Sequence, residues 1–326
     1  MNSSQTLLDR FEPYFEKINQ ALAGILTSPV ELVNEIGRHS LLGQGKRVRP
    51  LLFVLSSRLC GSPDTEEMYR ISTVFECIHT GSLLHDDVLD NAETRRNKPA
   101  ARQVWGNHAS VLGGDYLYTK ALELALTTGN TEFLRVLNQM SLEMVEGQML
   151  ELANTDNWDI GREDYMRIIT SKTAVLMSAA SASGGVLAGA EKKVVERLRS
   201  FGLNLGIAFQ LVDDVLDYTS CEEVFGKPVG KDLREGKITL PLIYTLCALD
   251  RAENERIKSL FQSEKVAEED LESLISMVRE GEAIGRVQAE AREYMRKAAV
   301  SLDPFPDSPM KQDLLALNAY LCERRF

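Results

Sequence analysis

The 326-residue sequence is poor in proline and cysteine, has fewer basic than acidic residues and lacks a long, strongly apolar run. Only ten prolines occur, and none lies between Pro99 and Pro228. Because proline breaks helix interiors, an interval of this length permits long helices. The five cysteines are scattered, odd in number and without a CxxC pair. They argue against a disulfide framework or a zinc site and favour the reducing cytoplasm.

The charge balance and the apolar segments exclude two further classes of protein. Lys and Arg total 37 against 48 Asp and Glu, a formal net charge of −11, which disfavours a general nucleic-acid binder. The longest uncharged stretch, residues 173–190, is rich in Ala, Ser and Gly, which favours a tightly packed helix over a membrane span. The first 22 residues lack a basic segment followed by an apolar one, so we expect no signal peptide and no stable membrane insertion.

Apolar residues recur at helical spacing across the long intervals without proline. Residues 134–152 and 198–212 are two cases, and alternating strand patterns are few. The sequence therefore predicts an all-α protein of about ten or more helices. The segments rich in proline, glycine and aspartate are short, so we expect a single domain over residues 1–326.

The acidic motif DDVLD occurs twice, at residues 86–90 and 213–217, each time after an apolar helical run. In a helix the first and last aspartates of each copy lie about 40° apart and share a face. Like charges at this spacing destabilise an isolated helix by a few tenths of a kcal/mol, so a counter-charge is expected. Oxygen ligands of this kind suit Mg²⁺, which binds one or two carboxylates and fills its shell with water and substrate phosphates. A solvated acidic face is the alternative, and the repetition of the motif disfavours it.

Several compact groups of basic residues accompany the acidic motifs. Residues 45–50 read GKRVRP, two arginines follow at residues 95–96, and a lysine–threonine pair stands at residues 172–173. Three more lysines lie in the glycine-punctuated segment 225–241, which matches no P-loop. Arginine binds phosphate oxygens through two parallel hydrogen bonds, whereas lysine acts as a point charge. Together with the acidic motifs, these groups predict two diphosphate sites, one bridged through Mg²⁺ and one held directly by cations.

The motifs together identify a family. The chain resembles the trans-polyprenyl diphosphate synthases of the long-chain, octaprenyl type over nearly its whole length. The segments that carry the resemblance are GKRVRP at 45–50, HTGSLLHDDVLDNAETRRNKPA at 79–100, GGDYLY at 113–118, EGQ at 146–148, SKTAVL at 171–176, FQLVDDVLD at 209–217 and GKPVGKDLREGKITLPLIY at 226–244. The resemblance implies the isoprenoid synthase fold, a bundle of mostly antiparallel helices around a central cavity, and a homodimer.

The resemblance also implies residue roles. Magnesium would be bound by Asp86, Asp90 and Asp213, with support from Asp87, Asp214 and Asp217. The residues expected to hold isopentenyl diphosphate are Lys46, Arg49, His79 and Arg96. Those expected to contact the allylic diphosphate are Arg95, Lys172, Thr173, Gln210, Lys227 and Lys237. The residues expected to be catalytic are Asp86, Asp87, Asp90, Lys172, Asp213 and Asp214. One departure is Asn97, where family members often have glycine.

The expected reaction begins with ionisation of the allylic diphosphate. The double bond of isopentenyl diphosphate then attacks the carbocation, and a proton leaves to the departed diphosphate. No nucleophilic serine or cysteine is required. A general-base role is the alternative for both His79 and His85, for which we expect diphosphate contact and helix packing respectively.

Two small residues before the first aspartate of the first motif predict the length of the product. Bulky aromatics at the fourth and fifth positions before it stop growth early in this family, and here these positions are Ser82 and Gly81. The growing tail can pass, since each buried methylene contributes about 0.8 kcal/mol, so we expect about six to ten isoprene units, roughly C30–C50, as in a quinone side chain. Close helix packing is the alternative reading of both residues.

Three other functions remain open at this stage. A shorter-chain farnesyl or geranylgeranyl diphosphate synthase would share the same site. A terpene cyclase also uses an aspartate-rich motif in a helical fold, but it would not need Lys46 and Arg49. The alternative outside enzymes is a regulatory subunit of a heteromeric prenyl synthase, although such partners commonly lose one motif and both are present here.

Overall fold

The computed structural model describes residues 3–43, 45–96, 98–220, 229–261 and 266–322, and these are helical almost throughout. The helices are α1 (Ser3–Gly24), α2 (Glu31–Leu41), α3 (Val48–Leu59), α4 (Glu66–Leu89), α5 (Ala101–Leu126), α6 (Thr131–Ala153), α7 (Arg162–Ile169), a π-helical turn η1 (Thr170–Ala174), α8 (Val175–Leu187), α9 (Lys192–Thr219), α11 (Lys231–Arg234), α12 (Leu240–Ala248), α13 (Arg251–Phe261), α14 (Glu268–Glu280), α15 (Ala283–Ser301) and α16 (Pro309–Cys322). A short antiparallel pair, β1 (Thr94–Arg95) and β2 (Lys98–Pro99), joins α4 to α5.

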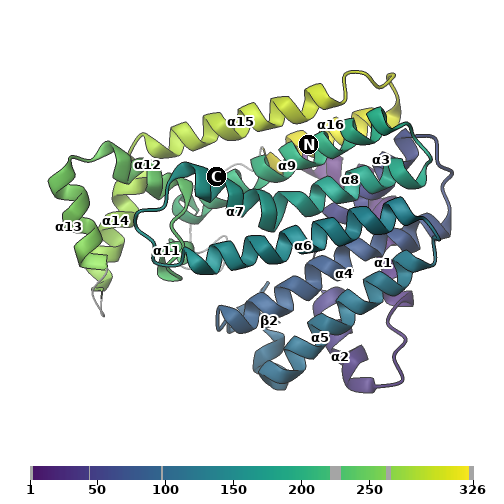
Figure 1. Cartoon of the computed structure of the whole chain (residues 1–326), viewed down its shortest axis with the longest axis horizontal. Helices are drawn as coiled ribbons and strands as arrows, with labels where there is room; N and C mark the ends of the chain where they lie inside the picture. The colour runs from purple at the N-terminus through teal and green to yellow at the C-terminus, as the bar shows by residue number, and fades with distance from the viewer. Residues whose placement is uncertain (1–2, 44, 97, 221–228, 262–265, 323–326) are drawn as a thin grey trace.

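The interval without proline forms the long helices of the bundle. It contains α5, α6 and α9, of 26, 23 and 28 residues, and α7 and α8 lie between them. Figure 1 shows α4, α5, α6 and α8 running side by side, with α12, α13 and α14 grouped at one end of the molecule. The prediction of an all-α protein with about ten or more helices is confirmed.

Helix α8 shows what the uncharged stretch at residues 173–190 does. Its residues 175–185 are all buried, and it packs against α3 and α9. The approach is very close, because a Cβ at Gly184 would come within 2.6 Å of the Phe53 carbonyl oxygen. Small side chains thus place α8 in the interior of the bundle. Among the described residues no helix combines the length and the apolarity needed to cross a membrane.

Helices α4 and α9 place the two acidic motifs. Helix α4 begins after Thr65, whose side chain accepts a hydrogen bond from the Met68 amide at 3.3 Å, and ends so that Asp90 is the residue after its last turn. The second motif lies wholly inside α9, two residues before its end. Helix α9 also contributes apolar residues to both core clusters, Leu205 to one and Leu211 to the other. The packed core therefore holds both motifs in place.

Candidate active site

The two acidic motifs meet at one cavity. It has a volume of about 320 Å³, and both the end of α4 and the end of α9 contribute to its wall. Although the two copies start 127 positions apart (213 − 86), five of their aspartates line this cavity, namely Asp86, Asp90, Asp213, Asp214 and Asp217. The helices thus bring together the residues that the sequence assigned to metal binding.

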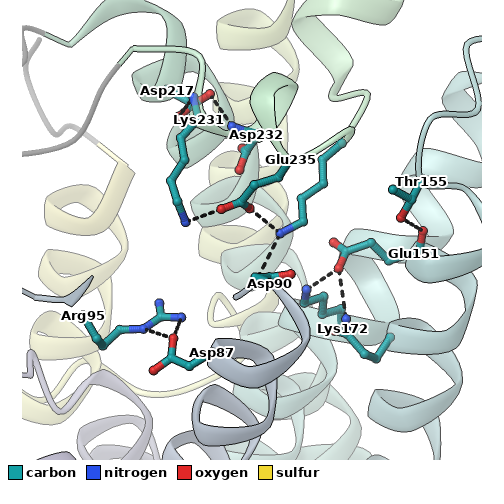
Figure 2. A network of polar contacts seen from close by, with 12 residues as sticks. Asp87, Asp90, Arg95, Glu151, Thr155, Lys172, Asp217, Lys231, Asp232 and Glu235 are labelled. Carbon is teal, nitrogen blue, oxygen red and sulfur yellow. Dashed lines mark hydrogen bonds and ion pairs between the residues drawn. The ribbon is translucent and has the colours of Figure 1, made fainter. Parts of the chain in front are cut away.

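Asp87 has a different position from its neighbours in the first motif. Its side chain is buried and accepts hydrogen bonds from Nε of Arg95, at 2.8 Å, and from Nη2 of the same residue. Figure 2 shows this pair apart from the other carboxylates of the site. Arg95, on β1, also lines the cavity. Asp87 therefore orients an arginine, which is a supporting role.

In the second motif Asp213 faces the cavity, while Asp214 and Asp217 are held by hydrogen bonds within the protein. Asp213 is exposed at the cavity, whereas Asp214 is buried and accepts hydrogen bonds from the Tyr165 hydroxyl and from Nε2 of Gln210, the latter at 2.8 Å. Asp217 accepts hydrogen bonds from the backbone amides of residues 231 and 232 at 3.2 and 3.1 Å. The loop carrying the cavity lysines is thereby tied to α9. Nothing in the sequence singled out Tyr165.

The predicted allylic-site lysines lie at the same cavity, each against a carboxylate. Nζ of Lys237 lies 3.2 Å from Oδ2 of Asp90 and 2.7 Å from Oε2 of Glu235, and Lys172 forms an ion pair with Glu151 (Figure 2). The Thr173 hydroxyl donates a hydrogen bond to Oε1 of Gln210 at 3.0 Å. Glu151 and Glu235 were not anticipated as site residues. Lys227 and Asn97 lie outside the described residues.

A π-helical turn positions Lys172 and Thr173. The pair lies in η1, which connects α7 directly to α8. Two glycines let it pack closely against α6 and α9: a Cβ at Gly147 would be 2.7 Å from the Lys172 amide nitrogen, and one at Gly206 would be 2.6 Å from the Ala174 Cα. Single π-helical turns inside α-helices are frequent at functional sites. The glycine of the EGQ motif therefore makes room for the lysine-bearing turn.

Two carboxyl groups that line the cavity, those of Asp86 and Asp232, have raised pKa values. Burial raises the pKa of Asp86, and the nearby Asp90 and Glu151 carboxylates raise it further while Lys172 opposes them. Burial and the Asp217 charge raise the pKa of Asp232 to about 7. A cluster of carboxylates that disfavour one another's ionisation is an environment that a bound cation stabilises.

Three of the four residues predicted to hold isopentenyl diphosphate lie beside this cavity. Arg49 and His79 line a second cavity of about 400 Å³, and Arg96 lines a smaller adjoining one. The exposed Lys46 instead lines a separate cavity together with residues of α1 and α16. Burial lowers the pKa of His79 well below its usual value, and four arginines around it act in the same direction. Its imidazole is therefore neutral near pH 7 and can donate one hydrogen bond.

The second cavity has a polar end and an apolar end. It shares Asp86, Lys172, Thr173, Gln210 and Asp213 with the first cavity. Besides these and the polar residues Arg49, His79, His85 and Gln148, its wall contains less polar side chains that include Ser82, Tyr118, Met144, Leu176 and Phe209. A substrate whose charged end lies among the aspartates can extend an apolar tail into this space.

Of the two small residues singled out for product length, only Ser82 lines the cavity. Gly81 faces α5 instead, where a Cβ would come within 3.0 Å of Cδ2 of Tyr118 and 3.1 Å of the Gly114 carbonyl oxygen. For Gly81 the structure therefore shows close helix packing, the alternative considered from the sequence. Tyr118, from the GGDYLY segment, lines the cavity and was not predicted.

His85 fills the contact between α4 and α5. Its ring stacks on Tyr118 with centroids 6.0 Å apart, and Nε2 lies 3.1 Å from the Val111 carbonyl oxygen. A Cβ at Gly114 would come within 2.3 Å of that nitrogen, so the glycine is needed for the contact. The structure thus gives His85 a packing environment, as the sequence suggested.

Comparison with known proteins shows which family has this arrangement. The profile of the polyprenyl synthetase family matches residues 30–278. The chain belongs to this family. It is 37% identical over 307 residues to octaprenyl diphosphate synthase of Escherichia coli (strain K12), covering 94% of each chain. It is 33% identical over 311 residues to heptaprenyl diphosphate synthase component 2 of Bacillus subtilis (strain 168), covering 95% of this chain and 87% of the relative.

A solved structure shows the same fold. The crystal structure of polyprenyl synthase from Caulobacter crescentus CB15, complexed with calcium and isoprenyl diphosphate, matches with a TM-score of 0.90 and 35% identity, covering 99% of this chain and 98% of that one. The chain therefore has the all-α fold of the isoprenyl synthases. It is a prenyltransferase of isoprenoid synthesis, as the motifs predicted.

Proposed function

We propose that the protein is a Mg²⁺-dependent trans-polyprenyl diphosphate synthase that condenses isopentenyl diphosphate with an allylic diphosphate to give a long all-trans product. The observation that carries the proposal is the continuity of the two cavities, one acidic and bordered by cations, the other largely apolar. The small Ser82 lines the apolar space instead of an aromatic residue. A tail of about C30–C50 gains stability with each methylene that it buries, and such a product suits a quinone side chain.

The carboxylates at the cavity fit a hard divalent cation. Asp86, Asp90 and Asp213 supply oxygen donors from two helices that face the same space. In the part of the chain that the structure describes, no group of three or more His, Cys, Asp or Glu side chains is placed to hold a metal ion by itself. Water and diphosphate oxygens would complete the shell, as Mg²⁺ prefers. When bound, the ion neutralises negative charge on the leaving diphosphate.

The side chains of the first cavity stabilise the departing group. Lys172, Lys237 and Arg95 present positive charge where the diphosphate develops its own charge, in a site partly shielded from water. In this structure the two lysines form ion pairs with carboxylates, Lys172 with Glu151 and Lys237 with Glu235. Exchange of these carboxylates for diphosphate oxygens keeps the number of ion pairs and moves them to the reacting group. Thr173 and Gln210, already hydrogen-bonded together, complete the polar wall.

The second substrate, isopentenyl diphosphate, binds to a group of basic residues next to the first cavity. Lys46, Arg49 and Arg96 hold the diphosphate of isopentenyl diphosphate, and the neutral His79 imidazole donates a hydrogen bond. The carbon–oxygen bond of the allylic diphosphate breaks, the double bond of isopentenyl diphosphate attacks the cation, and a proton leaves to the released diphosphate. Asp87 and Asp214 act by holding Arg95 and Gln210.

The setting of the enzyme is part of the proposal. We infer one domain over residues 1–326, since α9 contributes to both apolar clusters of the core. A cytoplasmic location follows from the scattered, odd number of cysteines. A homodimer is supported by the exposed apolar side chains of α5 and α6.

Incubation of the purified protein with Mg²⁺, farnesyl diphosphate and labelled isopentenyl diphosphate tests the proposal, with products sized by mass spectrometry. Linear polyprenyl diphosphates of about six to ten units are expected. A product of three or four units would make the protein a shorter-chain synthase. Cyclic hydrocarbon made without isopentenyl diphosphate would point to a cyclase, and no elongation unless a second protein is added would indicate a subunit of a heteromer.

A further inference from the structure

Arg47 turns its side chain into the protein interior, although its neighbours Lys46 and Arg49 are the predicted substrate ligands. Its backbone is left-handed, with φ 49° and ψ 31°, which is uncommon outside glycine, and only 4% of its side chain is exposed. All three guanidinium nitrogens are used. Nε donates to Oδ1 of Asn19 at 2.9 Å, Nη1 to Oε1 of Glu76 at 2.7 Å, and Nη2 to the Gly43 carbonyl oxygen at 3.0 Å. Arg47 therefore joins α1, α4 and the loop before α3.

Glu76 is the buried carboxylate at the centre of this cationic region. It lies on α4, three residues before His79, and its side chain is 3% exposed. Burial lowers the pKa of Arg49 to about 10 and lowers that of Arg96, and the Glu76 charge opposes both shifts. Glu76 thus pairs with Arg47 and also acts electrostatically on Arg49 and Arg96, and this set of one carboxylate and three guanidinium groups keeps two net positive charges (3 − 1) for a diphosphate.

The loop backbone brings two of these guanidinium groups together. A Cβ at Gly45 would come within 2.7 Å of Nη1 of Arg47 and 2.8 Å of Nη1 of Arg96. Nε of Arg49 is buried and has no hydrogen-bond partner among the described residues. The Arg47 guanidinium, which is paired with Glu76, therefore lies against the loop backbone at Gly45, as does the Arg96 guanidinium.

We propose that Glu76 and Arg47 form a positioning pair that holds the cations of the isopentenyl diphosphate site in place without contacting the substrate. The inference rests on the proposed function for the identity of that substrate. The pair fixes the left-handed turn between Lys46 and Arg49, and Gly45 leaves space for the guanidinium groups. The allylic site is held by other contacts, those of Lys172 and Lys237 with Glu151 and Glu235. Disturbing the pair is therefore expected to weaken the binding of isopentenyl diphosphate and to leave the binding of the allylic diphosphate unchanged.

Two variants disturb the pair in different ways. Arg47→Lys keeps the charge but cannot make the three separate hydrogen bonds. Gly45→Ala removes no charge, but its methyl group must displace the guanidinium ends of Arg47 and Arg96. In both, the KM for isopentenyl diphosphate is expected to rise about tenfold, while the KM for the allylic diphosphate stays unchanged. Titration calorimetry with isopentenyl diphosphate alone should show the same loss of affinity.

Arg162→Lys is the matched control. Arg162 also links three helices, because it donates hydrogen bonds to the Tyr244 hydroxyl on α12 at 3.0 Å and to Glu290 on α15 at 2.7 Å. It does not line either cavity of the site. Its replacement should change the thermal midpoint of unfolding without changing either KM.

Three outcomes would overturn the positioning role. The first is an unchanged KM for isopentenyl diphosphate in Gly45→Ala. This outcome contradicts the positioning role even if Arg47→Lys does not fold. An equal rise in both KM values, together with a lower thermal midpoint, is the second, since it describes a merely structural pair. If the wild type consumes no isopentenyl diphosphate, the proposed function fails instead. Calorimetry with inorganic diphosphate then tests the pair by itself. The third overturning outcome is that Gly45→Ala and the wild type bind inorganic diphosphate with equal affinity.

Discussion

Ser82 is one residue at which the length of the product can be changed. It lies one turn before Asp86, lines the second cavity and donates a hydrogen bond to the His79 carbonyl oxygen at 2.8 Å. Ser82→Phe places a ring in the path of the tail, so we expect the main product to shorten to about three or four units while turnover stays within a few-fold of the wild type. Products are to be sized by mass spectrometry.

Ser259→Phe is the control for this change, because it introduces the same ring at an exposed position of α13. It should leave the product distribution as it is. An unaltered distribution in Ser82→Phe as well would remove the assignment of this cavity to the growing tail.

His79 should make stability depend on pH. Its pKa is lowered in the folded protein, whereas the unfolded chain has the ordinary value of 6.5. Below that pH the unfolded state takes up a proton that the folded state does not, so stability is complete above it and falls as the pH drops. The free energy of unfolding should decrease by up to about 1.4 kcal/mol per pH unit from this group.

Denaturant unfolding of wild type and His79→Gln between pH 7 and 5 measures this contribution. The difference between the two curves isolates His79 from the buried aspartates, whose raised pKa values act in the opposite direction. His108→Gln, at an exposed position, is the control. Parallel curves for wild type and His79→Gln would show that the imidazole does not resist protonation in the folded state.

At the scale of the element, the π-helical turn η1 depends on one glycine of α6. Gly147→Ala puts a methyl group 2.7 Å from both the Lys172 amide nitrogen and the Ser171 Cβ, and backbone cannot move aside as a side-chain end can. The turn must shift, and Lys172 with it. We expect turnover to fall at least tenfold and the KM for the allylic diphosphate to rise, since small displacements of positioning groups cost large factors in rate.

Gly285→Ala provides the comparison. Gly285 lies exposed in α15 with open space around its position, so alanine should stabilise the helix by up to about 1 kcal/mol and leave the kinetics alone. Steady-state kinetics and thermal unfolding of both variants measure the two effects. Wild-type kinetics in Gly147→Ala would mean that the turn does not position Lys172.

Sequence patterns predicted the helices well because proline placement and apolar spacing are local signals. They also predicted that the DDVLD motifs serve one site, since repetition of charged residues after apolar runs has few structural explanations. The π-helical turn was missed because its residues, TSKTA, carry no feature that separates a wider turn from an ordinary one. Tyr165 and Glu151 were missed for a related reason. Each contacts a site residue on another helical segment, Asp214 for Tyr165 and Lys172 for Glu151, and the local sequence does not show such contacts.

At the scale of the whole molecule, the exposed apolar side chains concentrate on two helices. Among the described residues, nine of the fourteen large apolar side chains that are exposed lie on α5 and α6. On α6 they are Leu142, Val145, Met149 and Leu152, at the 3- and 4-residue spacing of one helix face. Such a stripe on a globular protein marks an interaction surface.

We propose that a second copy of the chain covers this stripe. Val145 and Met149 also line the apolar cavity, so an apolar partner there keeps water from the growing tail. The wild type should therefore be a dimer by sedimentation equilibrium. Leu142→Glu should shift it to the monomer and lower turnover, because two buried carboxylates at a symmetric interface disfavour association. Leu32→Glu, at an exposed position of α2, should leave the dimer intact. A wild type that sediments as a monomer but binds anionic phospholipid vesicles through this stripe would assign it to a membrane surface and refute the dimer.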